Sequence, residues 1–271
     1  MPSKEINLNK MEPRITLGFT YYDEPELLKR QLEFWKYYPT GVEIFIVDDA
    51  SPNYPAKDIL KDVYFFNGPD IQLWEVGYDM GFNSHGCRNL IAKYAPTNWI
   101  CFLDMDHMMN PSDVARIKRR QLNENKVYNF PTYHPYRSLY QDEEGINMAI
   151  IHKDLFWEAG GYDESFTGYH MGDREFWDRV EAVERFDRFQ KEEIVLTVLR
   201  GKRQIFIEED LGDMAIYGNE ELGTGATLSL NKPLPSVEEL KGTIDIKLNF
   251  PHTKIDRKST RLNSSHRCIS Y

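Results

Sequence analysis

The chain has 271 residues, of which 41% are hydrophobic and 13% aromatic, enough to build the core of one large domain or two small ones. The formal net charge of −10 argues against a nucleic-acid backbone as a partner. An acidic protein that binds a phosphorylated ligand needs a divalent cation or a few well-placed arginines beside the phosphates. Cys87, Cys101 and Cys268 are far apart and form no CxxC pair, which argues against a zinc site or a disulfide framework.

Neither a membrane span nor a secretory signal is expected. No window approaches eighteen consecutive apolar residues, and the first residues, MPSKEINLNKMEP, contain no apolar signal-peptide core. We therefore expect a cytoplasmic protein in which residues 1–13 are an N-terminal extension.

Residues 256–271 differ from the rest of the chain, being rich in arginine and serine without an amphipathic period. The stretch DRKSTRLNSSH resembles one reading frame of a common sequencing adapter. We treat 256–271 as a non-native tail and expect one domain over residues 14–255. The alternative is a natural basic, disordered tail.

The first half of the chain alternates strand and helix patterns. RITLGFTYY predicts a strand, and Pro25 favours the start of a helix that we expect to extend to Tyr38. VEIFIV and IQLWEV predict two more strands, and a glycine-rich loop precedes a short helix over residues 87–95. WICFL, from Trp99, predicts a fourth strand. Strands that are apolar on both faces and alternate with helices indicate an α/β fold with a mostly parallel sheet covered on both sides.

In the second half, SDVARIKRRQL predicts a helix with Ser112 as its N-cap. VYNFPTYHPYR and GINMAIIHKDLFWEAGGYDE predict strands around a loop, the second leading into a short helix and a Gly-Gly turn. A charged amphipathic helix is expected over residues 172–186. Short strands with long polar loops follow from Val195 to Ile255, and residues 217–235 have no periodicity, as in a lid or a disordered segment.

Acidic residues follow three of the predicted strands: Asp23 and Glu24, Asp48 and Asp49, Asp104 and Asp106. Ligands of an open parallel sheet bind at the carboxyl ends of its strands. Side chains at i and i+2 of an extended segment point the same way, so Asp104 and Asp106 can address one cation together. Their oxygens suit Mg²⁺ or Mn²⁺. Taken alone, such a pair is also typical of a turn or a helix cap.

Five segments resemble glycosyltransferase family 2, which has the GT-A nucleotide-sugar-binding fold, and they occur in that family's order. They are ITLGFTYYDEPELLKRQLEFW, IFIVDDASP, GFNSHGCRN, WICFLDMDHMMNP and HKDLFWEAGGYDESF. The resemblance spans residues 14–180. It implies a Rossmann-like GT-A domain with a nucleotide-binding half at 14–111 and a smaller, β-containing acceptor-side half at 112–255.

The resemblance implies that Thr20 and Asp49 lie around the nucleoside, with Asp49 accepting a hydrogen bond from the base, usually uracil. Arg88 would contact the nucleotide or its phosphates, Asp104 the ribose and the metal, and Asp106 the metal. A guanidinium suits a diphosphate because it makes bidentate, charge-assisted hydrogen bonds. Without the resemblance, the acids after the second strand also fit a turn, and the arginine fits a surface salt bridge.

The resemblance further implies a catalytic base at the start of the 172–186 helix, where family members often carry an acidic pair. Here Gly172 replaces the glutamate, so Asp173 is the candidate base, with Glu175 and Asp178 on the same helix. A helix N-terminus stabilises a carboxylate, which suits a base. The alternative is that Asp173 only caps the helix.

Histidines offer one more candidate ligand. Some GT-A enzymes use a C-terminal histidine as a third metal ligand, which makes His252 in LNFPHTKI a candidate, although a lone histidine is usually structural. His107 directly follows Asp104, Met105 and Asp106, which form a D-x-D motif, and His134 and His170 lie in predicted loops.

The sequence therefore predicts an inverting glycosyltransferase that uses Mn²⁺ or Mg²⁺. It would transfer a sugar from a nucleotide-diphosphate donor, most simply a UDP-sugar, to a hydroxyl of a glycan, lipid or protein acceptor. One alternative is a catalytically inactive GT-A module that binds a nucleotide sugar or a partner protein. Another is a haloacid-dehalogenase-type phosphatase. In such phosphatases the D-x-D motif lies near the N-terminus, and a small hydroxyl or aliphatic residue normally follows two places on. Here about a hundred residues precede the motif and Met108 occupies that place.

Overall fold

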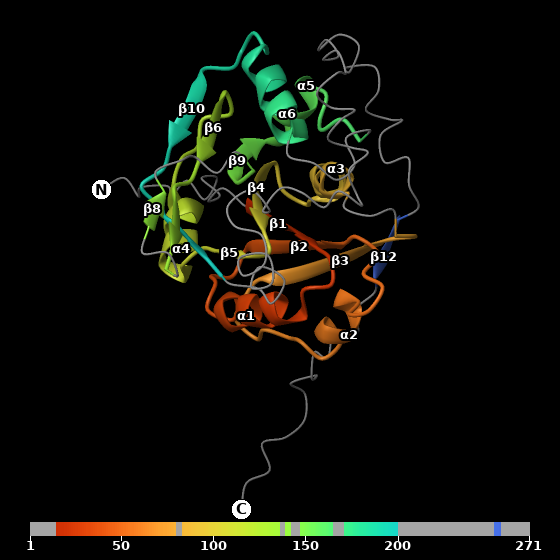
Figure 1. Ribbon diagram of the computed structural model, residues 1–271. Helices are drawn as coiled ribbons and strands as arrows, with labels where there is room; N and C mark the ends of the chain where they lie inside the picture. The colour runs from red at the N-terminus through yellow and green to blue at the C-terminus, as the bar shows by residue number, and fades with distance from the viewer. Residues whose placement is uncertain are drawn as a thin grey trace, which may run out of the picture.

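The computed structural model describes residues 15–79, 83–135, 139–141, 147–164, 171–199 and 252–255 (Figure 1). The N-terminal extension, the unperiodic segment at 217–235 and the tail at 256–271 lie outside the described residues. Within the described part of the chain, no helix is long and apolar enough to cross a membrane.

A large sheet lies at the centre of the described residues. Its strands are β1 (Ile15–Tyr21), β2 (Val42–Asp48), β3 (Asp70–Val76), β4 (Trp99–Asp104), β6 (Lys126–Asn129), β9 (Ala149–His152), β10 (Arg188–Lys191) and β12 (His252–Ile255). They follow the order β10-β6-β9-β4-β1-β2-β3-β12. The strands β1 to β4 pair in parallel, as do β6 and β10, whereas β9 is antiparallel to β4 and β6, and β12 to β3. The predicted mostly parallel α/β sheet is confirmed.

Helices cover both faces of this sheet (Figure 1). They are α1 (Pro25–Trp35), α2 (Ala56–Leu60), α3 (Ser84–Tyr94), α4 (Pro111–Arg119), α5 (Lys153–Glu158) and α6 (Met171–Glu181). Buried side chains of α1, α2 and α4 form one core with one face of the sheet, and those of α3, α5 and α6 form a second core with the other face. Every residue of β2 is buried because this strand is central and covered on both sides.

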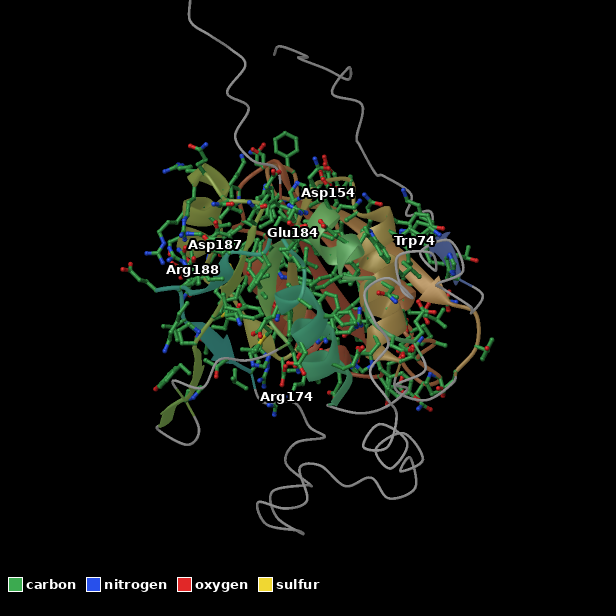
Figure 2. The ribbon with its side chains drawn as sticks, turned by 90° about the horizontal axis from the view of Figure 1, so that it is seen from above. Trp74, Asp154, Arg174, Glu184, Asp187 and Arg188 are labelled. Carbon is green, nitrogen blue, oxygen red and sulfur yellow. The ribbon has the colours of Figure 1, made fainter. Side chains whose placement is uncertain are left out.

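A smaller sheet begins directly after the D-x-D segment. It contains β5 (His107–Met108), β7 (Thr132–His134), β8 (Leu139–Gln141) and β11 (Leu196–Val198), in the order β5-β11-β7-β8. Seen from above, Trp74 on β3 and Arg188 on β10 lie at opposite sides of the molecule, in agreement with the order of the large sheet (Figure 2).

The helix boundaries differ from the predicted ones at several ends. The helix α1 ends at Trp35, not Tyr38, and α4 ends at Arg119, not Leu122. The helix α3 begins at Ser84, three residues before the predicted start, because the side chain of Asn83 caps it by accepting a hydrogen bond from Gly86 N at 3.2 Å. Asn110, and not Ser112, is the N-cap of α4, since Pro111 occupies the first helical position. The helix α6 ends at Glu181, five residues earlier than expected.

Candidate active site

The carboxyl ends of β1, β2 and β4 lie at the same edge of the large sheet. Thr20 on β1 is the register partner of Val47 on β2 and of Asp104 on β4. Asp49 directly follows β2, and its backbone N–H donates to Tyr21 O at 2.9 Å. The acids after β2 and β4 therefore lie at one edge of the sheet, as their positions at strand ends predict. Thr20, which the family resemblance singled out, lies beside Asp104.

The two aspartates after β2 have different environments. Asp48 accepts backbone hydrogen bonds from Ser51 N at 2.9 Å and Ala56 N at 2.6 Å, so it fixes the turn. Asp49 is 3% exposed, and its Oδ2 accepts from Asn83 N at 2.7 Å. Its Oδ1 is buried without a hydrogen-bond partner among the described residues. Burial raises the pKa of Asp49 to about 7, more than the hydrogen bonds from Asn83 and Cys87 can offset.

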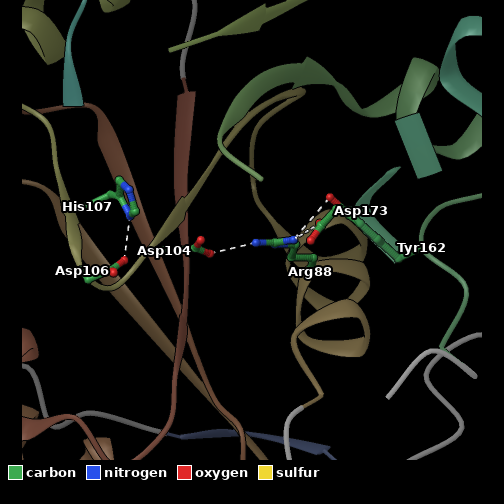
Figure 3. Close-up of polar contacts among 6 residues, drawn as sticks. All are labelled: Arg88, Asp104, Asp106, His107, Tyr162 and Asp173. Carbon is green, nitrogen blue, oxygen red and sulfur yellow. Dashed lines mark hydrogen bonds and ion pairs between the residues drawn. The ribbon is translucent and has the colours of Figure 1, made fainter. Parts of the chain in front are cut away.

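Asp104, Asp106 and His107 form the one group of potential metal ligands found among the described residues. One ligand atom from each residue lies within 4.8 Å of the others, and all three side chains are partly exposed. His107 Nδ1 and Asp106 Oδ1 share a hydrogen bond of 2.6 Å (Figure 3). Burial works against a charge on His107, but the neighbouring Asp106 and Asp104 outweigh it and raise the pKa of the imidazole.

Arg88, from α3, links the D-x-D segment to α6 (Figure 3). It is only 3% exposed, so the alternative of a surface salt bridge is wrong. Its Nη2 donates to Asp104 Oδ1 at 2.8 Å, and its Nη1 donates to Asp173 Oδ1. The guanidinium also lies 5.4 Å from the centre of the Tyr162 ring. Burial lowers the pKa of Arg88, but Asp173, Tyr162 and Asp104 outweigh it, so this pKa is raised.

Asp173 lies in the first turn of α6 and is 5% exposed. The preceding Gly172, which stands where the family often has a glutamate, faces the imidazole of His85. A Cβ at Gly172 would lie 2.5 Å from His85 Nε2 and 2.7 Å from its Cε1. The space of a side chain at this position is therefore filled by a buried histidine from α3.

The other acids of α6 point elsewhere. Glu175 makes a buried, bidentate ion pair with Arg179, with distances of 2.5 and 2.7 Å, and Arg179 also donates to Ala159 O. Asp178 is exposed. Arg179, held in place by Glu175, thus anchors α6 to the end of α5. Asp173 is the acid of this helix that Arg88 links to Asp104.

Asn89 supports the site in a way that sequence reasoning missed. Its Nδ2 donates to Tyr162 O and Glu164 Oε1, and its Oδ1 accepts from Tyr162 N, all at 2.8 Å. Arg88 and Asn89 are neighbours on α3. Through them, the GGYDE segment and α6 are held against this helix. The segment GCRN, already singled out, contained this signal.

His252 lies apart from the carboxylate cluster. It is on β12, paired with Val76 of β3, and its ring centre lies 5.9 Å from that of Trp74 and 5.7 Å from that of Tyr94. The group of ligand atoms identified within the described ranges contains His107 in its place. The adjacency of His107 to the D-x-D pair was the sequence signal for this residue.

An open, mostly parallel sheet with a carboxylate cluster at the end of a central strand is the arrangement of GT-A glycosyltransferases. The profile of Glycosyl transferase family 2 matches residues 18–179, which is more than half of the chain. The chain belongs to this family and is a glycosyltransferase. The family match leaves the phosphatase hypothesis without support. No curated protein matches the chain.

Solved structures share the fold at low sequence identity. Residues 1–349 of TarS from S. aureus give a TM-score of 0.54 at 13% identity, covering 87% of this chain and 72% of that one. The complex of the same TarS fragment with UDP-GlcNAc gives 0.54 at 15% identity, covering 85% and 71%. The mannosyltransferase PcManGT from Pyrobaculum calidifontis, in complex with GDP-Man and Mn²⁺, gives 0.54 at 12% identity, covering 89% and 75%.

Proposed function

We propose that this protein transfers a sugar from a UDP-sugar to an acceptor hydroxyl, with Mn²⁺ or Mg²⁺ held by Asp104, Asp106 and His107. The observation that carries the proposal is the cluster of these three ligands at the carboxyl end of β4, where nucleotide ligands of such sheets bind. Two structural neighbours are complexes with nucleotide sugars, one of them also with Mn²⁺.

The chemistry of the ligand set fits a divalent cation. Two carboxylates and one imidazole suit Mn²⁺, and the carboxylate oxygens also suit Mg²⁺. The partly exposed side chains leave room for a substrate diphosphate to complete the coordination. When bound, the cation would neutralise the charge of the departing diphosphate.

The surroundings of Asp49 favour uracil as the base. Its Oδ2 already accepts from Asn83 N, whereas its buried Oδ1 has no hydrogen-bond partner among the described residues and is the freer acceptor for a base N–H. Uracil offers one ring N–H flanked by carbonyls, whereas guanine offers two adjacent N–H groups that would need both carboxylate oxygens. The Nδ2 of Asn83 is likewise buried without a partner among the described residues, and it supplies a donor for a base carbonyl.

Asp173 is the proposed catalytic base of a single displacement with inversion. The acceptor oxygen attacks the anomeric carbon while the bond from this carbon to the diphosphate breaks, and the acceptor proton passes to Asp173. Arg88 fixes the position of Asp173 relative to Asp104, since one guanidinium binds both carboxylates. Thr20, at the end of β1, is the register partner of Asp104, which supports its proposed place beside the nucleoside.

A second candidate function is a catalytically inactive module that binds a nucleotide sugar. Two observations favour it: Gly172 supplies no carboxylate, and Asp173 is engaged by Arg88. A module of this kind would bind UDP but would neither transfer nor hydrolyse the sugar.

The experiment that tests the proposal is a thermal-shift screen of nucleotide sugars in the presence of Mn²⁺. A donor that binds the native state raises its apparent stability by about 2.7 kcal/mol at a hundred times its Kd. We expect UDP-sugars to raise the melting temperature, and GDP-, ADP- and CDP-sugars to raise it less. Equal shifts with all bases would contradict the role of Asp49, and turnover of the best donor separates the enzyme from the inactive module.

A further inference from the structure

Gln31 occupies a core position of α1 although it is polar. The buried residues of this helix are Leu27, Leu28, Gln31 and Trp35, which lie on one face at helical spacing. Gln31 is 0% exposed. A buried amide without hydrogen bonds is costly, so this position calls for a specific set of partners.

Those partners are backbone carbonyls of the D-x-D segment. Gln31 Nε2 donates to Met105 O at 2.9 Å and to His107 O at 2.8 Å. An amide nitrogen carries two hydrogens, and both are used here. The two carbonyls flank Asp106 on either side.

The carbonyl of Asp106 is also bound. It accepts a hydrogen bond of 2.6 Å from Leu199 N, directly after β11, and β11 pairs with β5 at His107 and Met108. The backbone carbonyls of Met105, Asp106 and His107 therefore all accept hydrogen bonds, two from Gln31 of α1 and one from the residue after β11. The turn that carries two of the three ligands of the cluster is held from both sides.

We propose that Gln31 is a positioning residue for the cation site, because it fixes the backbone from which Asp106 and His107 project. This inference rests on the proposed metal-dependent function. Removing a group that orients metal ligands without touching the cation typically weakens metal binding by about 10–100-fold.

Tyr38 provides a matched control. It is buried, follows α1, and donates from its hydroxyl to Met109 O at 2.7 Å. Its partner carbonyl lies beyond His107, outside the segment that carries the ligands. Removing this hydroxyl deletes a comparable buried side chain to backbone hydrogen bond and leaves the turn around Asp106 intact.

The test is the affinity for Mn²⁺ alone, measured by electron paramagnetic resonance titration of the full chain. We expect Gln31→Met, which keeps the length of the side chain but cannot donate, to weaken Mn²⁺ binding about tenfold or more. Tyr38→Phe should bind within about twofold of wild type. Circular dichroism of each variant establishes that it is folded. If Gln31→Met does not fold, Gln31→Asn replaces it. The asparagine side chain is too short to reach both carbonyls, so we expect the same loss of Mn²⁺ affinity.

The possible failures are distinguishable. If wild type binds Mn²⁺, Asp106→Ala does not, and the folded Gln31 variant binds like wild type, the role of Gln31 is overturned while the metal site stands. The role of Gln31 is also overturned if Tyr38→Phe weakens Mn²⁺ binding as much as Gln31→Met does. The loss of affinity would then follow from removing any buried hydrogen bond of this core. If wild type binds no Mn²⁺, the proposed metal site falls, and the role of Gln31 falls with it.

Discussion

Arg88 and Asp173 form a buried ion pair that joins α3 to α6, and the same guanidinium reaches Asp104 at the end of β4. The family resemblance assigned Arg88 to the nucleotide and Asp173 to the acceptor. Their direct contact means that the candidate base and the candidate metal ligand share one buried cation. The two sides that the resemblance assigns to the donor and the acceptor are thus connected through a single side chain.

Arg88→Met should therefore be strongly destabilising. It leaves two carboxylates near each other without their cation, and breaking a buried pair in this way typically costs about 3–5 kcal/mol. Urea unfolding measures the loss. The control is Lys29→Met, which removes an exposed ion pair with Glu26 at 3.1 Å and should cost less than about 1 kcal/mol. A similar, small effect of both variants would show that the Arg88 bridge contributes little.

Gly172→Ala should be destabilising because its Cβ would lie 2.5 Å from His85 Nε2. Overpacking of this kind costs about 1–3 kcal/mol. Truncation of the imidazole in His85→Ala provides the missing space, so the double variant should be more stable than the sum of the single effects. Thermal unfolding of all four proteins gives the interaction free energy, and additive effects would contradict the contact.

UDP affinity should depend on the protonation of Asp49. The base N–H needs a carboxylate as acceptor, and the pKa of Asp49 in the folded protein is raised to about 7. We expect the affinity to rise about tenfold per pH unit below this value and to level off above it. Calorimetric titration from pH 5.5 to 8.5 measures the profile, and Asp49→Asn should bind weakly with a flat profile.

The same pKa predicts a pH dependence of stability. The ordinary pKa of an aspartate is 3.8, and that of Asp49 in the folded protein is about 7. At pH values between these two, the folded protein keeps a proton on Asp49 that the unfolded chain has lost. The free energy of unfolding should therefore fall as pH rises through this window and stay low above it. Asp49→Asn removes this contribution, so the difference in stability between the variant and wild type should grow in favour of the variant from pH 4 to 7. A constant difference would contradict the raised pKa.

His107→Ala should weaken Mn²⁺ binding by at least about tenfold, whereas His252→Ala should leave it within about twofold. The reason is that His107 belongs to the ligand group with Asp104 and Asp106, while His252 contacts Trp74 and Tyr94. Calorimetric titration with Mn²⁺ distinguishes the two histidines. The reverse result would return His252 to the role that the family resemblance suggested.

Much of the fold could be predicted because its signals are local. The continuous apolar run of β2 indicates a strand that is buried on both faces, and the amphipathic repeat of α1 indicates a helix that is buried on one face. The short strand β10, of mixed burial, and the five-residue helix α2 have no such period, so they were missed. The start of α3 depends on a cap by Asn83 in a segment that resembled a loop.

The site was predictable only as a set of strand ends. The sequence predicts that acids follow the ends of β2 and β4, whereas the register that places Thr20 beside Asp104 is seen in the structure. The bridge from Arg88 to Asp173 joins residues 85 positions apart, and the contact of Gly172 with His85 depends on how α6 packs against α3. Such tertiary contacts produce no periodic pattern in the sequence. The role of Gln31 was hidden for the same reason, since one glutamine on an apolar helix face does not reveal which carbonyls it meets.

The most direct test of the central claim is the Mn²⁺-dependent turnover of a UDP-sugar by wild type and by Asp106→Ala. Asp58→Asn, which removes an exposed carboxylate outside the site, is the control for the change of charge. We expect wild type and Asp58→Asn to release UDP only when Mn²⁺ or Mg²⁺ is present, and Asp106→Ala to be slower by about 100-fold or more. Unchanged, metal-dependent turnover by purified Asp106→Ala would contradict the assignment of this cluster as the metal site of the transferase.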